Sequence, residues 1–231
     1  MKEFFTRAYE ILFTGSRGGF LLEGYLNTLL ITAGAIVIGI IGGTILAVFK
    51  VMPQNKLPAK ILAKFADLYI AVFRGTPVLV QLALFYFVIF AGIGMDPILI
   101  AIIGFGFNSA AYVAEIMRAG ISSVDIGQFE AGRAVGLGYA TTMFKVIIPQ
   151  AIKNIIPSLG NELIVLVKET SVASVITITD FFNACRYITS KSYNFQIPYL
   201  FAAVVYLVTV YVLAFLIKLV ERRLKKSERR R

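Results

Sequence analysis

The stretch "GQFEAGRAVGLGYATTMFKVIIP", Gly127 to Pro149, lies between two strongly apolar segments of the chain. It is too polar to cross a membrane and too short to be a domain. The residues from Ile126 to Leu137 tolerate a helix, and Gly132 and Gly136 put small residues four apart. Such a surface is flat enough to fit into a groove on another protein. The alternative, from physics alone, is a surface helix that only connects two spans.

The composition places this loop in a membrane protein. Hydrophobic residues make up 58% of the 231 residues, charged residues make up 16%, and the mean hydropathy is +0.80. A soluble domain is nearer half apolar and a quarter charged. The chain has no histidine, which removes the commonest metal ligand and proton shuttle. Its single cysteine, Cys185, excludes an internal disulfide, and we interpret it as a small apolar residue.

Five apolar segments are predicted to span the membrane, since a span needs about 20 mostly apolar residues. The Gly39/Gly43 spacing in the first segment is a GxxxG pattern, which we interpret as helix packing. "RGTP" interrupts the second segment, where Pro77 cannot donate a backbone N–H and Arg74 is costly in lipid. We therefore expect a broken or kinked helix at 74–77. The predicted spans are 26–51, 62–91, 97–118, 155–178 and 198–220.

Basic residues lie at alternate ends of these spans. They follow spans one, three and five, the last group running from Lys218 to Arg231, whereas "AGIGMDP" between spans two and three has none. By the positive-inside rule the basic ends are cytoplasmic, which puts the N-terminus outside and the C-terminus inside. The net charge of +10 then reflects orientation and contact with acidic lipid, and no nucleic-acid partner is expected.

The N-terminal residues, "MKEFFTRAYEILFTGSRGG", lack the long apolar region and small-residue cleavage site of a removable signal. We expect them to form an amphipathic helix on the outer surface of the membrane. Its aromatic residues would enter lipid; they are Phe4, Phe5, Tyr9 and Phe13.

"EAGRAVGLGYATTMFKVIIPQAIKNIIPSLGNE" resembles the EAA loop of bacterial ABC importer permeases. That pattern runs Glu-Ala-Ala, three residues, Gly, nine residues, Ile, one residue, Leu-Pro. Gly132 stands where the pattern has its second alanine. Val146 and Ile148 stand where it has isoleucine and leucine, and both are conservative departures. "FRGTPVLVQL", "NSAAYVAEIMRAGI", "LGNELIVLVKETS" and "GYLNTLLIT" resemble signatures of one subfamily, the polar-amino-acid permeases. The resemblance covers roughly residues 24 to 223.

This resemblance implies an all-α integral membrane protein with the type I importer permease fold. It implies one transmembrane domain over residues 1–231, in the bacterial cytoplasmic (inner) membrane. The chain would have no cofactor of its own, and it contains no G-x-x-x-x-G-K-[ST] loop. The implied partners are two cytoplasmic ATPase subunits that bind ATP and Mg, a second permease chain, an extracytoplasmic binding protein, membrane lipid and a polar amino acid. The loop 126–149 would be the coupling helix that docks on the ATPase through Gln128, Phe129, Glu130, Ala131, Gly132, Arg133 and Gly136.

Polar groups inside the spans are the candidates for substrate binding, because each is expensive in lipid without a purpose. Glu169 is favoured as the residue that meets an ammonium group of the substrate. The other candidate, Glu162, lies seven residues earlier on roughly the same helix face. Lys168 or Arg74 could instead pair with Glu169 structurally. Asn and Gln side-chain amides can both donate and accept hydrogen bonds, which suits an amino acid substrate. They also form hydrogen bonds between helices in membrane proteins. The predicted substrate residues are Glu169, Asn108, with Ser109 beside it, Gln81, Asn161 and Ser171; the predicted structural or gating residues are Arg74, Pro77, Glu115 and Arg118.

Three other classes of protein are alternatives to an importer permease. An ion-gradient-driven secondary carrier could use Glu169, but many such carriers have repeated halves, and no repeat is detectable here. A membrane scaffold explains the loop but not the polar groups inside the spans. A membrane enzyme has least support, since no nucleophile and base are recognisable, and no catalytic or metal-binding residue is predicted. Dependence on an ATPase partner and on substrate separates these classes.

Overall fold

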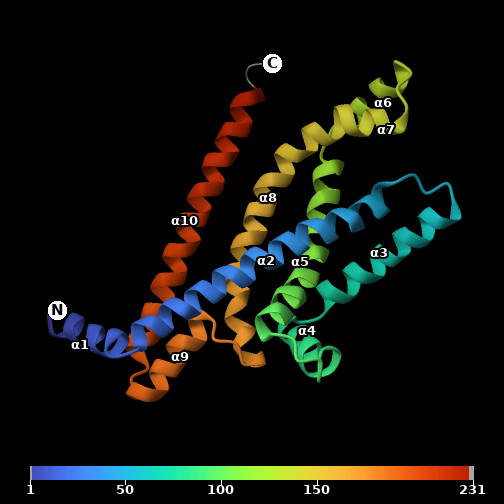
Figure 1. Cartoon of the computed structure of the whole chain (residues 1–231). Helices are drawn as coiled ribbons and strands as arrows, with labels where there is room; N and C mark the ends of the chain where they lie inside the picture. Colours follow the sequence, from blue (N-terminus) through green and yellow to red (C-terminus); the bar gives the residue numbers. More distant parts are fainter. Residues whose placement is uncertain (1, 229–231) are drawn as a thin grey trace. The chain divides into compact units, whose positions relative to one another are not determined.

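The computed structural model describes residues 2–228, and its regular elements in that range are all helices, as expected. Two π-helical turns, η1 (Phe85–Ile89) and η2 (Met143–Ile147), and a 3₁₀ helix, η3 (Thr170–Ile176), interrupt the α-helices. The basic residues 229–231 of the predicted cytoplasmic tail lie outside the described residues. The α-helices are α1 Lys2–Phe13, α2 Arg17–Val51, α3 Leu57–Gly75, α4 Val78–Leu84, α5 Pro97–Ser122, α6 Ile126–Ala134, α7 Tyr139–Thr142, α8 Ile148–Glu169, α9 Phe181–Ser192 and α10 Gln196–Glu228 (Figure 1).

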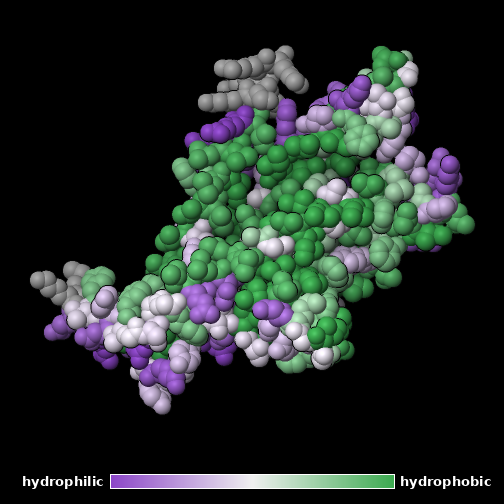
Figure 2. Space-filling model, viewed as in Figure 1, coloured by the Kyte–Doolittle hydropathy of each residue, from purple (hydrophilic) through white to green (hydrophobic). Residues whose placement is uncertain are grey.

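Among residues 2–228, three helices, α2, α5 and α10, are long and apolar enough to span a membrane. A fourth candidate exists only if α3 is counted together with α4 and η1 as one broken span. On the face shown in Figure 2, hydrophobic residues cover most of α10. The predicted span at 155–178 is not among the candidates, because α8 carries polar residues along its length and ends at Glu169, where η3 begins. Five spans and the orientation of the termini therefore stay predictions.

The predicted break in the second apolar segment is confirmed. α3 ends at Gly75, and Pro77 has an extended backbone (φ −64°, ψ 135°) directly before α4. Proline has no N–H to donate and disfavours helical angles in the residue before it. Gln81 Nε2 donates to the carbonyl and the hydroxyl oxygen of Thr76, at 3.0 and 2.7 Å. The Gln81 side chain therefore connects the first turn of α4 to Thr76, the residue before Pro77.

The chain divides into two compact units. In the first unit, one cluster of buried residues joins α2, α4, α5, α8 and η3 around Phe105. A second cluster joins α1, α2, α9 and α10 around Phe181. It contains Cys185, a free and buried thiol, in agreement with its interpretation as an apolar residue. The first unit comprises Met1–Val37, Thr76–Gly106 and Ile164–Val212; the second comprises Ile38–Gly75, Phe107–Leu163 and Leu213–Arg231.

Small residues bring α2 close to α5 in the second unit. A Cβ atom added to Gly39 would lie 2.7 Å from Ser109 Oγ, and one added to Gly43 would lie 2.6 Å from Val113 Cβ. Real Cβ atoms essentially never approach so closely, so only glycine permits this spacing of the two backbones. The interpretation of the GxxxG pattern as helix packing is confirmed.

The predicted N-terminal helix is present as α1. Phe4, Phe5 and Tyr9 have 51%, 68% and 67% of their surface exposed, whereas Leu12 is buried in the cluster that contains α9. α1 therefore has one packed face and one exposed aromatic face. Its contact with lipid stays a prediction.

Asp180 is a fully buried carboxyl group at the start of α9. It accepts a hydrogen bond from Phe182 N at 2.9 Å and so caps the helix. Its other oxygen, Oδ1, has no hydrogen-bond partner among residues 2–228. Burial raises the pKa of Asp180 to about 6, although the N–H of Phe182 and the charge of Arg186 oppose the shift. The folded protein therefore holds this proton more tightly than the unfolded chain.

We expect the free energy of unfolding to fall as pH rises from the usual aspartate value of 3.8 to about 6. In this window the folded state binds more protons than the unfolded state, so rising pH favours unfolding. Asp180→Asn should remove this dependence, because asparagine caps helices equally well and carries no charge. At neutral pH it should stabilise the protein by up to roughly 3 kcal/mol.

Thermal unfolding in detergent between about pH 4 and about pH 8 measures this effect. Asp96→Asn is the matched control, since the exposed Asp96 also bonds a backbone N–H, that of Ile98, at 2.7 Å. The control should keep the wild-type pH dependence. Identical pH profiles for the wild type and Asp180→Asn would contradict the raised pKa.

Candidate functional site

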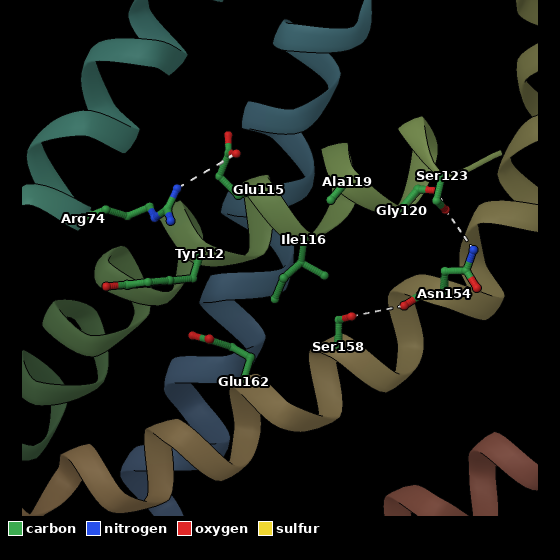
Figure 3. A pocket seen from close by; sticks show the side chains of 10 residues that line it. All are labelled: Arg74, Tyr112, Glu115, Ile116, Ala119, Gly120, Ser123, Asn154, Ser158 and Glu162. Atoms are coloured by element: carbon green, nitrogen blue, oxygen red, sulfur yellow. Dashed lines mark hydrogen bonds and ion pairs between the residues drawn. The ribbon is translucent and has the colours of Figure 1, made fainter. Parts of the chain in front are cut away.

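A polar cavity of about 440 Å³ lies in the second unit, bounded by the end of α3, the second half of α5 and the first part of α8 (Figure 3). It combines basic, acidic, hydroxyl and amide groups, and its size falls in the range of roughly 300–1,000 Å³ that is usual for small-molecule sites. The lining residues are Arg74, Tyr112, Glu115, Ile116, Ala119, Gly120, Ser123, Asn154, Ser158 and Glu162.

Glu115 is the centre of a group of ion pairs on one side of this cavity. Arg118 Nη2 and Lys50 Nζ lie 2.8 and 3.0 Å from its carboxylate oxygens, and Arg74 Nη1 lies 3.9 Å away. Lys50 also contacts Asp67 at 2.9 Å. These pairs connect α2, α3 and α5 through one carboxylate. The structure thus brings together the predicted structural residues Glu115, Arg118 and Arg74.

Arg74 carries a positive charge to the wall of the cavity. Its guanidinium carbon lies 5.4 Å from the centroid of the Tyr112 ring, within the range of a cation–π contact. Its 3.9 Å contact with Glu115 is too long for a hydrogen bond. With 45% of its side chain exposed, Arg74 can offer its fork of donors to a carboxylate in the cavity.

Glu162 is the acid that α8 contributes to the cavity. It is 8% exposed, and its Oε1 accepts a hydrogen bond from Ser109 Oγ at 2.8 Å. Figure 3 shows Arg74 on α3 and Glu162 on α8, so a guanidinium group and a carboxyl group reach the cavity from two helices. That combination matches a ligand with one anionic and one cationic group.

Asn154 and Ser158 lie one turn apart on α8, between Glu162 and the start of the helix. Asn154 Nδ2 donates to Ser123 Oγ at 2.8 Å, and Ser158 Oγ donates to the Asn154 carbonyl at 3.2 Å. These groups give the cavity a hydrogen-bonding wall. Neither residue is among those predicted from the sequence, although their four-residue spacing on the face of Glu162 is a usable signal.

The predicted substrate residues do not line this cavity. Asn108 is buried, and its Nδ2 donates to the Phe73 carbonyl in the last turn of α3 at 3.3 Å. Because the last carbonyls of a helix lack intrahelical partners, Asn108 satisfies the end of the broken helix, as Gln81 satisfies the start of the next one. Asn161 is exposed on α8.

Of the two glutamates weighed on α8, Glu162 lines this cavity and Glu169 does not, and the preference for Glu169 as a substrate residue stays a prediction. Glu169 is the last residue of α8 and belongs to the first unit, whereas Glu162 lines the cavity in the second. Arg74, the proposed structural partner of Glu169, pairs with Glu115 instead. Ser171 lines a separate cavity of about 290 Å³ in the first unit and donates to the Lys168 carbonyl at 2.7 Å.

The loop 126–149 folds as α6, α7 and η2, with α6 and α7 side by side (Figure 1). Asp125 caps the start of α6 by accepting a hydrogen bond from Gly127 N. Gly136 ends this helix with a φ of 79°, a left-handed angle that favours glycine. The Gly136 and Leu137 N–H groups donate to the Arg133 and Gly132 carbonyls, both at 2.9 Å, which forms a Schellman cap.

Two of the predicted coupling residues face the inside of the loop. A Cβ atom on Gly132 would lie 2.7 Å from Thr142 Cγ2, and Phe129 packs on the buried cluster that contains Met143. The Tyr139 hydroxyl donates to the Val51 carbonyl at 2.8 Å and ties the loop to the end of α2. Burial raises the pKa of Tyr139, which keeps this donor protonated. The exposed members of the predicted coupling set on α6 are Gln128, Glu130, Ala131 and Arg133.

Comparisons with known proteins agree with one another. The profile of the family described as "Binding-protein-dependent transport system inner membrane component" matches residues 35–226. A Rickettsia bellii protein that carries the name of a glutamine transport system permease is 41% identical over 207 residues, or 89% of this chain and 93% of its own. The arginine transport system permease protein ArtQ of Bacillus subtilis is 39% identical over 211 residues, 90% and 94% of the two chains.

Solved structures show the same fold. A crystal structure titled as an amino acid ABC transporter with histidines contains a chain that is 41% identical, with a TM-score of 0.81 over 89% of this chain and 94% of that one. A chain of an inward-facing methionine ABC transporter is 20% identical, with a TM-score of 0.76 over 89% and 96%. The second likeness concerns the fold alone.

We expect Glu115→Gln to lower the free energy of unfolding by about 1–3 kcal/mol, less than for a fully buried pair because the partners are partly exposed. The change removes the anion around which Lys50, Arg74 and Arg118 gather, and leaves their charges to repel one another. Denaturation in detergent measures the loss. Glu23→Gln, at an exposed position on α2, is the control and should change stability by less than about 0.5 kcal/mol.

A double-mutant cycle adds a second test of the same cluster. Lys50→Gln combined with Glu115→Gln should cost less than the sum of the two single changes, because each single change already removes the contact between Lys50 and Glu115. Strict additivity of the two losses would show that the pair contributes nothing to stability.

Proposed function

Because the chain belongs to the family of binding-protein-dependent transport system inner membrane components, we propose that it is the permease subunit of an ATP-driven ABC importer for a polar amino acid. The names of its relatives support an amino acid, since they cite glutamine and arginine, and the solved relative is titled with histidines. The observation that carries the proposal is the polar cavity of about 440 Å³, which holds Arg74 and Glu162 on different helices.

The cavity suits the groups that every α-amino acid shares. In this proposal the substrate carboxylate meets the Arg74 guanidinium, whose planar fork matches two carboxylate oxygens. The substrate ammonium meets Glu162, which Ser109 holds by its 2.8 Å hydrogen bond. Asn154 and Ser158 then face the substrate side chain, and amide and hydroxyl groups favour a polar one.

The loop of α6, α7 and η2 would connect this chain to its energy source. The exposed residues of α6, with Glu130 and Arg133 of opposite charge, would enter a groove on a separate ATPase that binds ATP and Mg. Closure of the ATPase would favour one state of the permease, which is the differential binding that any coupling requires. The hydrogen bond from Tyr139 to Val51 would carry the movement of the loop to α2.

The complete importer would contain further subunits in the bacterial inner membrane and outside it. We propose a second permease chain, two ATPase subunits and an extracytoplasmic binding protein that delivers the amino acid. The ion-gradient-driven carrier is disfavoured by membership of this family. Transport by the reconstituted complex that depends on both ATP and the binding protein would support the importer; uptake by this chain alone on an ion gradient would overturn it.

Glu162→Gln should weaken the apparent affinity for substrate by roughly tenfold to a hundredfold, the value of a hydrogen bond to a charged group. Glu169→Gln is the matched comparison, because the same change is made on the same helix at a residue that does not line the cavity. Uptake by proteoliposomes, measured across substrate concentrations, gives both values. A larger effect at Glu169 than at Glu162 would show that the substrate lies elsewhere.

Glu130→Arg should abolish recovery of the ATPase with a tagged permease chain, because it reverses the charge on the exposed face of α6. Glu10→Arg, on the exposed surface of α1, is the control and should leave recovery unchanged. Limited proteolysis of the loop checks that α6 still folds. An intact association with the ATPase and intact transport in Glu130→Arg would show that the coupling assignment is wrong.

A further inference from the structure

A second cavity of the same unit is apolar. It has a volume of about 460 Å³ and is bounded by the last turns of α2 and α5, by α7 and η2, and by the first half of α8. Of its seventeen lining side chains, only Thr44 and Tyr139 carry a polar group. We call this cavity the apolar groove. It is separate from the polar cavity, with which it shares no residue.

The groove offers no polar side-chain group to an occupant. The Thr44 hydroxyl donates to the Ile40 carbonyl at 2.6 Å, and the Tyr139 hydroxyl donates to the Val51 carbonyl at 2.8 Å. The remaining wall consists of alanine, valine, isoleucine, leucine, methionine and phenylalanine side chains. An occupant must therefore be apolar over the whole buried length, which excludes an amino acid or a nucleotide.

The mouth of the groove is apolar, and an exposed lysine follows it directly in the sequence. Val48 and Phe144 line it and have 54% and 71% of their surface exposed. Lys145 directly follows Phe144, is itself exposed, and forms no ion pair with another described residue. From Tyr139 to Leu159 the chain carries two lysines and no acidic residue. This end of α2 is also where its apolar run stops and lysines follow, as at a membrane boundary.

We propose that the apolar groove binds one acyl chain of an anionic phospholipid, whose phosphate lies at Lys145. The wall requires an apolar occupant, the exposed Lys145 next to Phe144 would attract an anionic headgroup, and a lipid from the surrounding leaflet has both properties. Because η2 and α7 form part of the wall, a lipid in the groove supports the same loop whose α6 carries Glu130. The identity of the membrane lipid would thus influence how firmly that loop is held against α2 and α8.

Photolabelling of the assembled, purified transporter in lipid nanodiscs tests this proposal. The probe is a phosphatidylglycerol with a photoreactive group near the end of one acyl chain, compared with the matching phosphatidylcholine. Labelled peptides should come mainly from 44–52 and 139–159. Phosphatidylglycerol should label about fivefold more than phosphatidylcholine, the effect of one lysine at a membrane surface.

Two variants with matched controls separate the acyl site from the phosphate site. Val48→Trp should fill the groove and strongly reduce labelling there, whereas Val37→Trp, at an equally exposed valine of the same helix, should not. Lys145→Gln should abolish the preference for phosphatidylglycerol but keep the labelling, and Lys64→Gln, at another exposed lysine, should change neither. Even labelling of all the helices, or labelling indifferent to Val48→Trp, would overturn the proposal. Labelling that appears only in the isolated chain would show that another protein covers the groove, and would overturn it too.

Discussion

The break between α3 and α4 is the feature on which the functional part of the structure depends. In an apolar segment every backbone polar group must find a partner within the protein, and a broken helix leaves such groups without one. Asn108 meets the Phe73 carbonyl at the end of α3, and Gln81 meets Thr76 before α4. The break also gives α3 an end inside the apolar segment, and Arg74 lies in that last turn. Its charge there reaches Glu115, and the polar cavity forms beside this contact.

The loop of α6, α7 and η2 depends on two glycine residues for its fold. Glycine at position 136 lets α6 stop with its last carbonyls bonded, and glycine at 132 lets α7 lie against it. The residues that hold the loop together are therefore different from those that it exposes. A surface for a partner can vary in charge while the underlying scaffold keeps its shape, because the two sets alternate along one short helix.

Much of the architecture could be predicted from local sequence. The apolar runs, the break at Pro77, the packing of Gly39 and Gly43, and the amphipathic α1 all follow from the spacing of residues along one segment. Arg118 lies three residues from Glu115, so their pair could be predicted as well. Lys50 also meets Glu115, but the two are 65 residues apart, and no local pattern indicates such a contact.

The choice between the two glutamates of α8 shows where sequence reasoning stops. Spacing places Glu162 and Glu169 on roughly one face, so it cannot tell which of them meets a cavity. That Glu162 lines the polar cavity and bonds to Ser109 depends on how α8 packs against α5, which is tertiary structure. Similarly, the amides of Asn108 and Gln81 donate hydrogen bonds to the two sides of the break between α3 and α4, which no local pattern indicates.

The helices α5 and α8 each separate two compartments of opposite character. Ile116 and Ser158 line the polar cavity, while their neighbours Met117 and Leu159 line the apolar groove. One residue corresponds to about 100° of helix rotation. Deleting a single residue near the start of either helix would therefore turn methyl groups into the polar cavity and polar groups into the groove. During evolution, single side chains of α5 and α8 can be substituted, but the number of residues in each helix is constrained.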